Sequence, residues 1–302
     1  MAVKITEVLG PLAPKIDIVD IGATWLGGFS VPYQPLTMSG LVNLTRFEPS
    51  SAECANLNSL GLPNQKYLPY FPGDGTRRKL HATDKPATSS IYEPNAKMLD
   101  RFQALEGLTQ VQKVSEVQTH RLDDMPELTN IDYLKIDVQG AELDVIRGGP
   151  KALKNAVVIH TEAAFVPLYK GQPLFGDVDA ALRAQGFMLH SFVAMSGRAF
   201  RPFMAPNEPT RPLRQNLWAD VVYVKDFDNL AALTADQLLK MAAILHECYS
   251  SWDLASLALA NYDAKIGDFS AWGATAGTKY PTWRKYMNSL MPGAPFEPPT
   301  IL

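Results

Sequence analysis

The chain has 302 residues, of which 46% are hydrophobic, 10% aromatic and 20% charged, a composition typical of a folded globular protein rather than a disordered one. Its 28 basic and 31 acidic residues give a formal net charge of −3, which argues against a nucleic-acid coat or a polybasic membrane binder. The two cysteines, Cys54 and Cys248, exclude a zinc cluster, while a disulfide stays open. We find no signal-peptide pattern and no apolar run long enough for a membrane span, so we expect a cytoplasmic protein.

Short apolar runs alternate with helical patterns in the first half of the chain, which predicts βαβ units and a mostly parallel sheet. Strands are expected at 16–21, 42–47, 66–70, 114–122, 133–138, 157–162, 187–195 and 218–224, with a hairpin between 79–82 and 90–92. Helices are expected at 51–60, 95–105, 141–147 and 177–185. The fold class is therefore α/β.

The C-terminal part has a different pattern. Thr234 and Gln237 form a capping box for a helix to about Glu247, and a second helix is expected over 253–264. The pair predicts an αα-hairpin packed on the sheet. From residue 267 the chain is rich in Gly, Trp and Pro, which predicts an extended tail. We expect three parts, an α/β domain (1–228), a helical hairpin (229–266) and a tail (267–302), the last two offering a surface for a homodimer.

Chemically informative residues follow the first two predicted strands. Asp20 and Gly22 end the first strand, where a glycine lets the backbone approach a ligand and a carboxylate accepts its hydrogen bonds. Thr24 stands where a dinucleotide fingerprint needs its second glycine, which weakens a dinucleotide-dependent oxidoreductase, one alternative function. Glu48 and Pro49 end the second strand, where an acid either binds a ribose diol or caps the next helix.

The most informative segment is 131–142, with the sequence IDYLKIDVQGAE. Lys135 and Asp137 are two residues apart in a strand and therefore share a face. A lysine buried there needs an acidic neighbour, for which Asp137, Glu142 and Glu162 are the candidates. Asp137 lies near the carboxyl end of its strand, the edge at which open α/β sheets bind ligands. A purely structural ion-pair network is the alternative interpretation.

The stretch LKIDVQGAE at 134–142, followed by Arg147, Gly148 and Gly149, resembles the signature of FkbM-type S-adenosylmethionine-dependent methyltransferases. VDIGA (19–23), FEP (47–49) and RLDD (121–124) resemble the same family in order. The resemblance implies a Rossmann-like class I methyltransferase fold, with a mostly parallel seven-stranded sheet, helices on both faces and an antiparallel last strand. It also implies methyl transfer from S-adenosyl-L-methionine, most often to a hydroxyl of a sugar, glycolipid or secondary metabolite.

The resemblance also implies roles for residues. The expected cofactor-binding residues are Asp20, Gly22, Ala23 and Thr24 on the methionine and ribose side, Glu48 and Pro49 at the ribose hydroxyls, Asp74 at the adenine edge and Asp137 facing the sulfonium. A hydroxyl must lose its proton during transfer, and Asp137 is the first candidate base, followed by Glu162 and His160. A lone histidine in a strand is more often a core residue, and this is the favoured interpretation of His160. No metal ligand set is predicted, although a divalent metal shared by Asp137 and Glu162 stays open.

Two segments are expected to frame a small-molecule or glycan acceptor. The apolar segment 163–175 forms either a wall over the site or part of the core. The segment 196–215 carries Arg198, Arg201, Arg211 and Arg214 together with Phe200 and Phe203. These arginines either hold a phosphate or carboxylate on the acceptor or belong to a solvated loop. The unusual loop 22–28 favours a further alternative, a non-catalytic binding protein on a methyltransferase fold.

Overall fold

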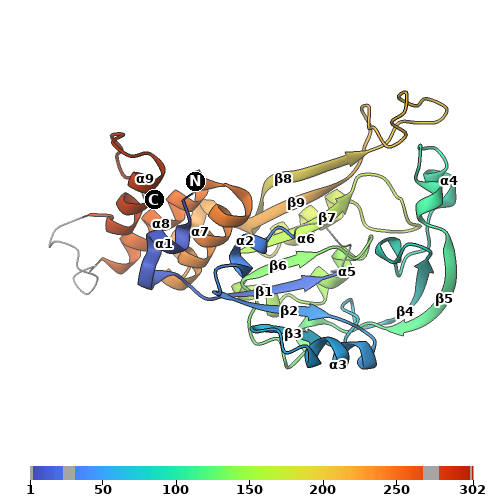
Figure 1. Ribbon diagram of the computed structural model, residues 1–302, viewed down its shortest axis with the longest axis horizontal. Coiled ribbons are helices and arrows are strands. Elements are labelled where there is room, and N and C mark those ends of the chain that lie inside the picture. The colour runs from blue at the N-terminus through green and yellow to red at the C-terminus, as the bar shows by residue number, and fades with distance from the viewer. Residues whose placement is uncertain (1–2, 23–30, 268–278, 300, 302) are drawn as a thin grey trace. The chain divides into compact units, whose positions relative to one another are not determined.

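The computed structural model describes residues 3–22, 31–267, 279–299 and 301, and the chain divides into two compact units (Figure 1). The first, which we call the sheet unit, contains residues 18–28 and 44–224. The second, the helical unit, contains residues 1–17, 29–43 and 225–302. Each unit therefore combines stretches that are far apart in the sequence.

A seven-stranded sheet has the strand order β3-β2-β1-β6-β7-β9-β8. Its strands are β1 (Ile16–Ile21), β2 (Val42–Phe47), β3 (Gln65–Leu68), β6 (Tyr133–Ile136), β7 (Val158–Ala164), β8 (Phe187–Gly197) and β9 (Asn216–Lys225). β1, β6 and β7 pair in parallel, as do β2 and β3, whereas β9 runs antiparallel to β7. The mostly parallel seven-stranded sheet with an antiparallel last strand is thus confirmed.

One buried cluster of the sheet unit lies against one face of the sheet. The α-helices of this unit are α3 (Ser51–Ser59), α4 (Ala96–Leu99), α5 (Glu142–Arg147) and α6 (Phe175–Arg183). Leu143 of α5 and Leu182 of α6 pack in one buried cluster with Leu134 and Ile136 of β6. Because successive strand residues face opposite sides, Lys135 points to the other face of the sheet.

Two local predictions in the sheet unit are wrong. β4 (Arg77–Thr83) pairs with β5 (Val111–Gln118) in a separate two-stranded antiparallel sheet, and Ser90 makes only an isolated bridge to His81. The helix expected over 95–105 is reduced to α4, because the chain turns to bury Phe102 against Phe200, with ring centroids 4.7 Å apart. A φ of 57° at Ala104 is also incompatible with a continuous helix.

The helical unit contains α1 (Ile5–Leu9), α2 (Gln34–Thr37), α7 (Ala235–Tyr249), α8 (Trp252–Ile266) and α9 (Pro281–Leu290). The predicted capping box is present, since Gln237 N donates to Thr234 Oγ1 over 3.2 Å and Thr234 N donates to Gln237 Oε1 over 2.9 Å. α7 and α8 pack along each other as the predicted helix pair. No described helix is both long and apolar enough to cross a membrane.

Part of the segment expected to be an extended tail is helical. α9 begins at a proline, which breaks a helix interior but is tolerated in the first turn, where its missing N–H would have no partner anyway. Trp283 N donates to Asp263 over 2.8 Å, and the Trp283 indole donates to Ser256 over 2.8 Å. Tyr286 OH lies 2.9 Å from His246 Nδ1. These buried contacts hold α9 against α7 and α8.

Candidate functional site

Strand register aligns an inner row of polar residues on the face of the sheet opposite the cluster that contains Leu134 and Ile136. Asp20 of β1 is the registered partner of Lys135 of β6, and Lys135 is the partner of His160 of β7. Lys135 Nζ lies 3.8 Å from Asp20 Oδ1, and Arg46 Nε lies 3.9 Å from Asp20 Oδ2. Asp20 is fully buried, so these cations compensate a charge that would be unstable there alone.

An outer row lies two residues closer to the carboxyl edge of the sheet. It contains Asp137, just beyond β6, together with Glu162 of β7 and its registered partner Asp220 of β9. Lys135 Nζ lies 3.5 Å from Asp137 Oδ2, and His160 Nε2 lies 3.6 Å from Asp220 Oδ1, so the two rows are linked. The register thus brings the three predicted candidate bases, Asp137, Glu162 and His160, to one face.

Gln139 bridges the two carboxylates of the outer row. Its side-chain amide donates to Asp137 Oδ1 over 2.9 Å and to Glu162 Oε1 over 3.5 Å. Its own oxygen accepts from the hydroxyl of Tyr169 over 3.2 Å. The sequence analysis missed Gln139, Tyr169 and Asp220. Gln139 lies within the signature segment, so the sequence could have pointed to it. Tyr169 and Asp220 reach the site only through the path of a loop and the register of β9, which no local sequence pattern reveals.

The charged groups of this cluster have competing effects on the pKa values of Glu162 and Lys135. Burial raises the pKa of Glu162 well above its ordinary value, and the nearby Asp137, Glu142 and Asp220 raise it further, against the opposite effect of Lys135. Burial alone would lower the pKa of Lys135, but Asp137 and Asp20 raise it above its ordinary value. The site therefore holds a firmly cationic lysine beside a carboxyl with enhanced proton affinity.

Glu142 organises the turn after β6. Its carboxylate accepts hydrogen bonds from Val138 N over 2.9 Å and Gly140 N over 3.0 Å. Gln139 and Gly140 both have positive φ, 56° and 98°, and these bonds stabilise that strained path. Burial raises the pKa of Glu142 to about 7. Of the three acidic neighbours expected for Lys135, Asp137 is the ion-pair partner, and Glu142 instead holds the backbone.

The end of β1 passes very close to the end of β6. Gly22 has a φ of 88°, and any Cβ at this position would overlap the carbonyl oxygen of Asp137. Asp137 N donates to Ile21 O over 2.9 Å, which continues the parallel pairing beyond β6. Glycine is thus required here for both conformation and space. The predicted cofactor residues Ala23 and Thr24 lie outside the described residues.

Glu48 and Pro49 follow the end of β2, as expected. Glu48 Oε1 accepts a hydrogen bond from Ser50 N over 2.8 Å, and Ser50 is the N-cap of α3, accepting from Glu53 N over 3.4 Å. Glu48 is half-buried and Pro49 exposed. The helix-capping arrangement is therefore present, and ribose binding by Glu48 stays a prediction.

Asp74 is held by internal contacts. It accepts hydrogen bonds from Thr76 N over 2.9 Å, from Thr119 Oγ1 over 3.2 Å and from Arg78 over 3.2 Å. Arg78 also lies 3.7 Å from Asp144, so Asp74 belongs to a network that anchors β4. Its role at the adenine edge stays a prediction.

The two acceptor segments differ in their surroundings. Phe165 and Phe175 pack against the core of the sheet unit, and their rings lie within 6.3 Å of Phe192, which favours the core interpretation of the segment 163–175. The loop 198–215 connects β8 and β9 (Figure 1). Its Phe200 and Phe203 are exposed.

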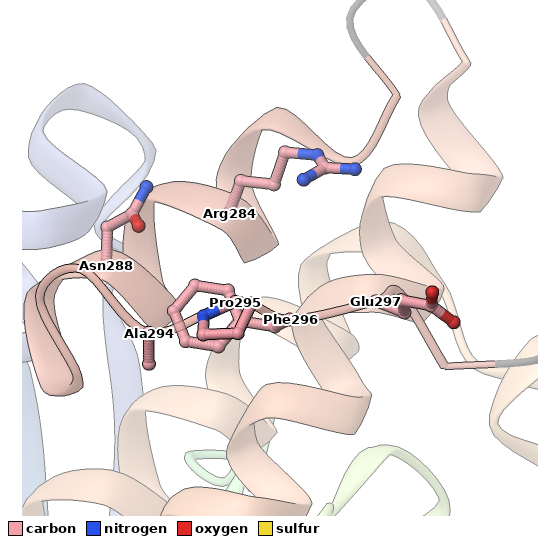
Figure 2. A pocket seen from close by; sticks show the side chains of 6 residues that line it. All are labelled: Arg284, Asn288, Ala294, Pro295, Phe296 and Glu297. Carbon is pink, nitrogen blue, oxygen red and sulfur yellow. The ribbon is translucent and has the colours of Figure 1, made fainter.

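A hollow of about 490 Å³ lies in the helical unit. Figure 2 shows its lining, which comes from α9 and the segment after it, namely Arg284, Asn288, Ala294, Pro295, Phe296 and Glu297. None of the predicted site residues that the structure describes lines this hollow. Among the described residues, no group of three His, Cys, Asp or Glu side chains is arranged to hold a metal ion.

Comparison with known proteins gives a match to a family model described as the methyltransferase FkbM domain, over residues 20–189. The 2-O-methyltransferase NoeI of Sinorhizobium fredii is 48% identical over 59 residues, which are 18% of this chain and 24% of that protein. The match thus spans about a quarter of that relative's length.

Two solved structures are similar at low identity. The magnesium protoporphyrin IX methyltransferase of Synechocystis PCC 6803, solved with bound S-adenosylmethionine, has 12% identity and a TM-score of 0.36, with 74% of this chain and 76% of that chain covered. An S-adenosylmethionine-dependent methyltransferase of Aquifex aeolicus has 10% identity and a TM-score of 0.30, with 73% and 89% covered.

Proposed function

We propose, because the chain belongs to the FkbM methyltransferase domain family, that it transfers the methyl group of S-adenosyl-L-methionine to a hydroxyl of a sugar, glycolipid or secondary metabolite. The observation that carries this proposal is the juxtaposition of Asp137 and Glu162 at the carboxyl ends of adjacent parallel strands, bridged by Gln139. That edge is where open α/β sheets bind ligands. The partial match to a 2-O-methyltransferase supports oxygen as the methylated atom.

The residues at this edge fit the cofactor. S-adenosylmethionine, when bound, supplies an electrophilic methyl group on a positively charged sulfonium. The side chain of Asp137 is 35% exposed and provides a negative charge to face that sulfonium. Glu48, half-buried at the end of β2, offers a carboxylate to ribose hydroxyls. Gly22 has no side chain, so the backbone at the end of β1 packs directly on the backbone of Asp137. Asp20, Ala23, Thr24 and Pro49 complete the proposed cofactor set.

Glu162 is the best placed of the three candidate bases. Asp137 accepts hydrogen bonds from both Gln139 and Lys135, so both of its carboxylate oxygens already have donors. His160 is only 3% exposed and lies in the inner row, two residues back from the edge. Glu162 lies in the outer row, and its raised pKa makes it a stronger base near neutral pH. We assign Glu162 to accept the proton of the acceptor hydroxyl as its oxygen attacks.

Gln139 and Tyr169 position the two carboxylates. The Tyr169 hydroxyl lies 3.0 Å from the Thr88 carbonyl oxygen and 3.2 Å from Gln139 Oε1, and the Gln139 amide nitrogen is directed at Asp137 and Glu162. Methyl transfer requires nucleophile, methyl carbon and leaving sulfur in line, so a fixed distance between these carboxylates fixes the acceptor relative to the cofactor.

Calorimetric titration with S-adenosylhomocysteine tests the cofactor site. We expect saturable binding to the wild-type protein and a loss of affinity of at least about tenfold in Asp137→Asn and in Glu48→Gln. Glu116→Gln, at an exposed position of β5, is the matched control and should bind like the wild type. Absence of wild-type binding at millimolar ligand would reject the proposal in favour of a non-catalytic protein on this fold.

Transfer of a labelled methyl group to a panel of methyl glycosides tests the base. Glu162→Gln should reduce kcat by about 10²–10⁴-fold while binding S-adenosylhomocysteine as well as the wild type. His160→Gln should have a much smaller effect on kcat. A Glu162→Gln variant with unchanged kcat and a raised pH optimum would assign the proton transfer elsewhere.

A further inference from the structure

The loop 198–215 carries four arginines, and they differ in their partners. Arg201 pairs with Asp100 over 2.6 Å, and Arg211 pairs with Glu208 over 3.7 Å. Within the part of the chain that the structure describes, Arg198 lies within ion-pair distance of no carboxylate. It is nevertheless the half-buried member of the group.

The backbone holds Arg198 in a defined place. Gly197, at the end of β8, packs so closely on Gln215 that any Cβ would overlap the Gln215 carbonyl oxygen. On the other side, Ala199 is buried, and its carbonyl accepts from Gln103 N over 3.0 Å. Arg198 therefore lies at the fixed base of the loop.

The side chain of Arg198 is also oriented. Its guanidinium carbon lies 5.5 Å from the centroid of the Trp218 ring, and Nη1 donates to the Gly197 carbonyl over 2.7 Å. Its Nε is buried and donates to no acceptor among the described residues. Burial lowers the pKa of Arg198, and no neighbouring acid opposes that effect. A guanidinium held in this way keeps N–H donors that can bind a further acceptor, and it lacks a compensating negative charge.

Strand register connects Arg198 to the proposed base. Trp218 of β9 is the partner of Ala164 of β7, two residues beyond the pair formed by Asp220 and Glu162. Alternate residues share a face, so Trp218 lies on the same face as Glu162, about 7 Å further along the strands. The guanidinium of Arg198 lies over that ring, and Trp218 thus links it to the strand pair that carries Glu162.

We propose that Arg198, oriented by Trp218, is the subsite that binds an anionic oxygen group of the methyl acceptor, and hence that the acceptor carries a carboxylate, sulfate or phosphate beside the hydroxyl to be methylated. This inference rests on the proposed function for the identity of the ligand as acceptor. The anion supplies the missing partner of Arg198, and its contact fixes the acceptor hydroxyl near Glu162. A planar guanidinium recognises such groups through paired N–H donors.

The test measures binding of anionic and neutral sugar probes to the full chain in the presence of S-adenosylhomocysteine. The probes are methyl glucuronide, glucose 1-phosphate, glucose 6-sulfate and neutral methyl glucoside, with inorganic phosphate and sulfate to separate recognition of the sugar from that of the free ion. Arg198→Gln should weaken binding of at least one anionic sugar by about 10–100-fold and leave methyl glucoside unchanged. Arg211→Gln, in the same loop, is the matched control and should change neither.

The outcomes separate this proposal from the proposed function. If the wild-type protein binds S-adenosylhomocysteine but no anionic probe shows a dependence on Arg198, the anion subsite is wrong and the methyltransferase proposal stands. Equal losses in Arg198→Gln and Arg211→Gln would also overturn the subsite, because they indicate a general charge effect. Arg198-dependent probe binding without any cofactor binding would support the subsite and reject the methyltransferase proposal. Arg198→Lys keeps the charge without the paired donors and should recover only part of the affinity.

Discussion

Gly22 and Asp137 approach so closely that the Cβ of any other residue at position 22 would overlap the carbonyl oxygen of Asp137. The contact joins the ends of β1 and β6, the two strands whose residues carry most of the proposed cofactor site. It also explains why a glycine follows the buried run at 16–21, since the chain must adopt a φ of 88° there without a side chain.

Gly22→Ala should destabilise the protein far more than a glycine substitution that meets only backbone strain. Gly171 is the matched control, because it also has a positive φ, 73°, but a Cβ at that position would meet nothing within 4 Å. We expect a loss in the free energy of unfolding of about 1 kcal/mol for Gly171→Ala and of more than about 3 kcal/mol for Gly22→Ala. Urea denaturation measures both, and equal losses would show that the close contact relaxes freely.

Lys135→Met should lower the free energy of unfolding by about 3–5 kcal/mol, because Asp20 then stays buried without its nearer cation. In the double variant Asp20→Asn with Lys135→Met, the loss should be smaller than the sum of the single losses. Lys170→Met is the control, since its ion pair with Glu93 is exposed and contributes less than about 1 kcal/mol. Additive losses in urea denaturation would indicate that Asp20 and Lys135 do not stabilise each other.

Glu142 should make stability fall with rising pH. Its folded pKa, about 7, is above the ordinary value of 4.5, so the folded state retains a proton that the unfolded state has lost between these pH values. The stability from this group is complete below about pH 4.5 and falls by about 3 kcal/mol as the pH rises through 7.

Glu142→Gln removes that titration but loses one hydrogen bond to the backbone. The variant should therefore be less stable than the wild type at about pH 4.5, and the difference should shrink or reverse at about pH 8. Because Glu142 also raises the pKa of Glu162, the change in the difference includes the effect of position 142 on that neighbour. Urea denaturation at the two pH values measures it, and a constant difference would contradict the raised pKa.

Asp263→Ala should loosen the packing of the first turn of α9 against α8. The buried carboxylate accepts the Trp283 N–H, so its removal should lower the free energy of unfolding by about 1–2 kcal/mol, as for a lost helix cap. Trp283 is only 2% exposed, and its fluorescence should shift to the red as it meets water. Asp236→Asn removes an exposed carboxylate that pairs with Lys240 at i,i+4 on α7 and should cost less than about 0.5 kcal/mol with no spectral change.

The elements predicted correctly from the sequence are those whose structure follows from a local residue pattern. The segments 16–21 and 42–47 match β1 and β2 residue for residue, since each places β-branched or other apolar residues at positions that its strand buries. By contrast, β5 is exposed along most of its length, and its pairing with β4 depends on residues about 30 positions away. No periodicity identifies such a partner.

The candidate site was likewise predictable only where a local residue pattern determines it. The spacing of Lys135 and Asp137 placed them on one face, and the structure shows their ion pair. Asp220 and Trp218 reach the same face only through the antiparallel register of β9 on β7, which is set by the whole sheet. Arg198 was one of four arginines that looked alike in the sequence, and burial distinguishes it from the others.

The helical unit brings together residues that are synthesised at very different times. Val3 O lies 2.7 Å from His246 Nε2, a separation of 243 residues along the chain, and Ile5 N donates to Glu247 over 2.7 Å. At about 5–20 residues per second, α1 is synthesised roughly 10–50 s before its partners in α7 exist. During that interval the apolar side chains of Ile5, Val8 and Leu9 have no α7 to cover them, while the sheet unit between them can already fold. The apolar face of α1 can therefore be buried against α7 only after residues 235–249 have been synthesised.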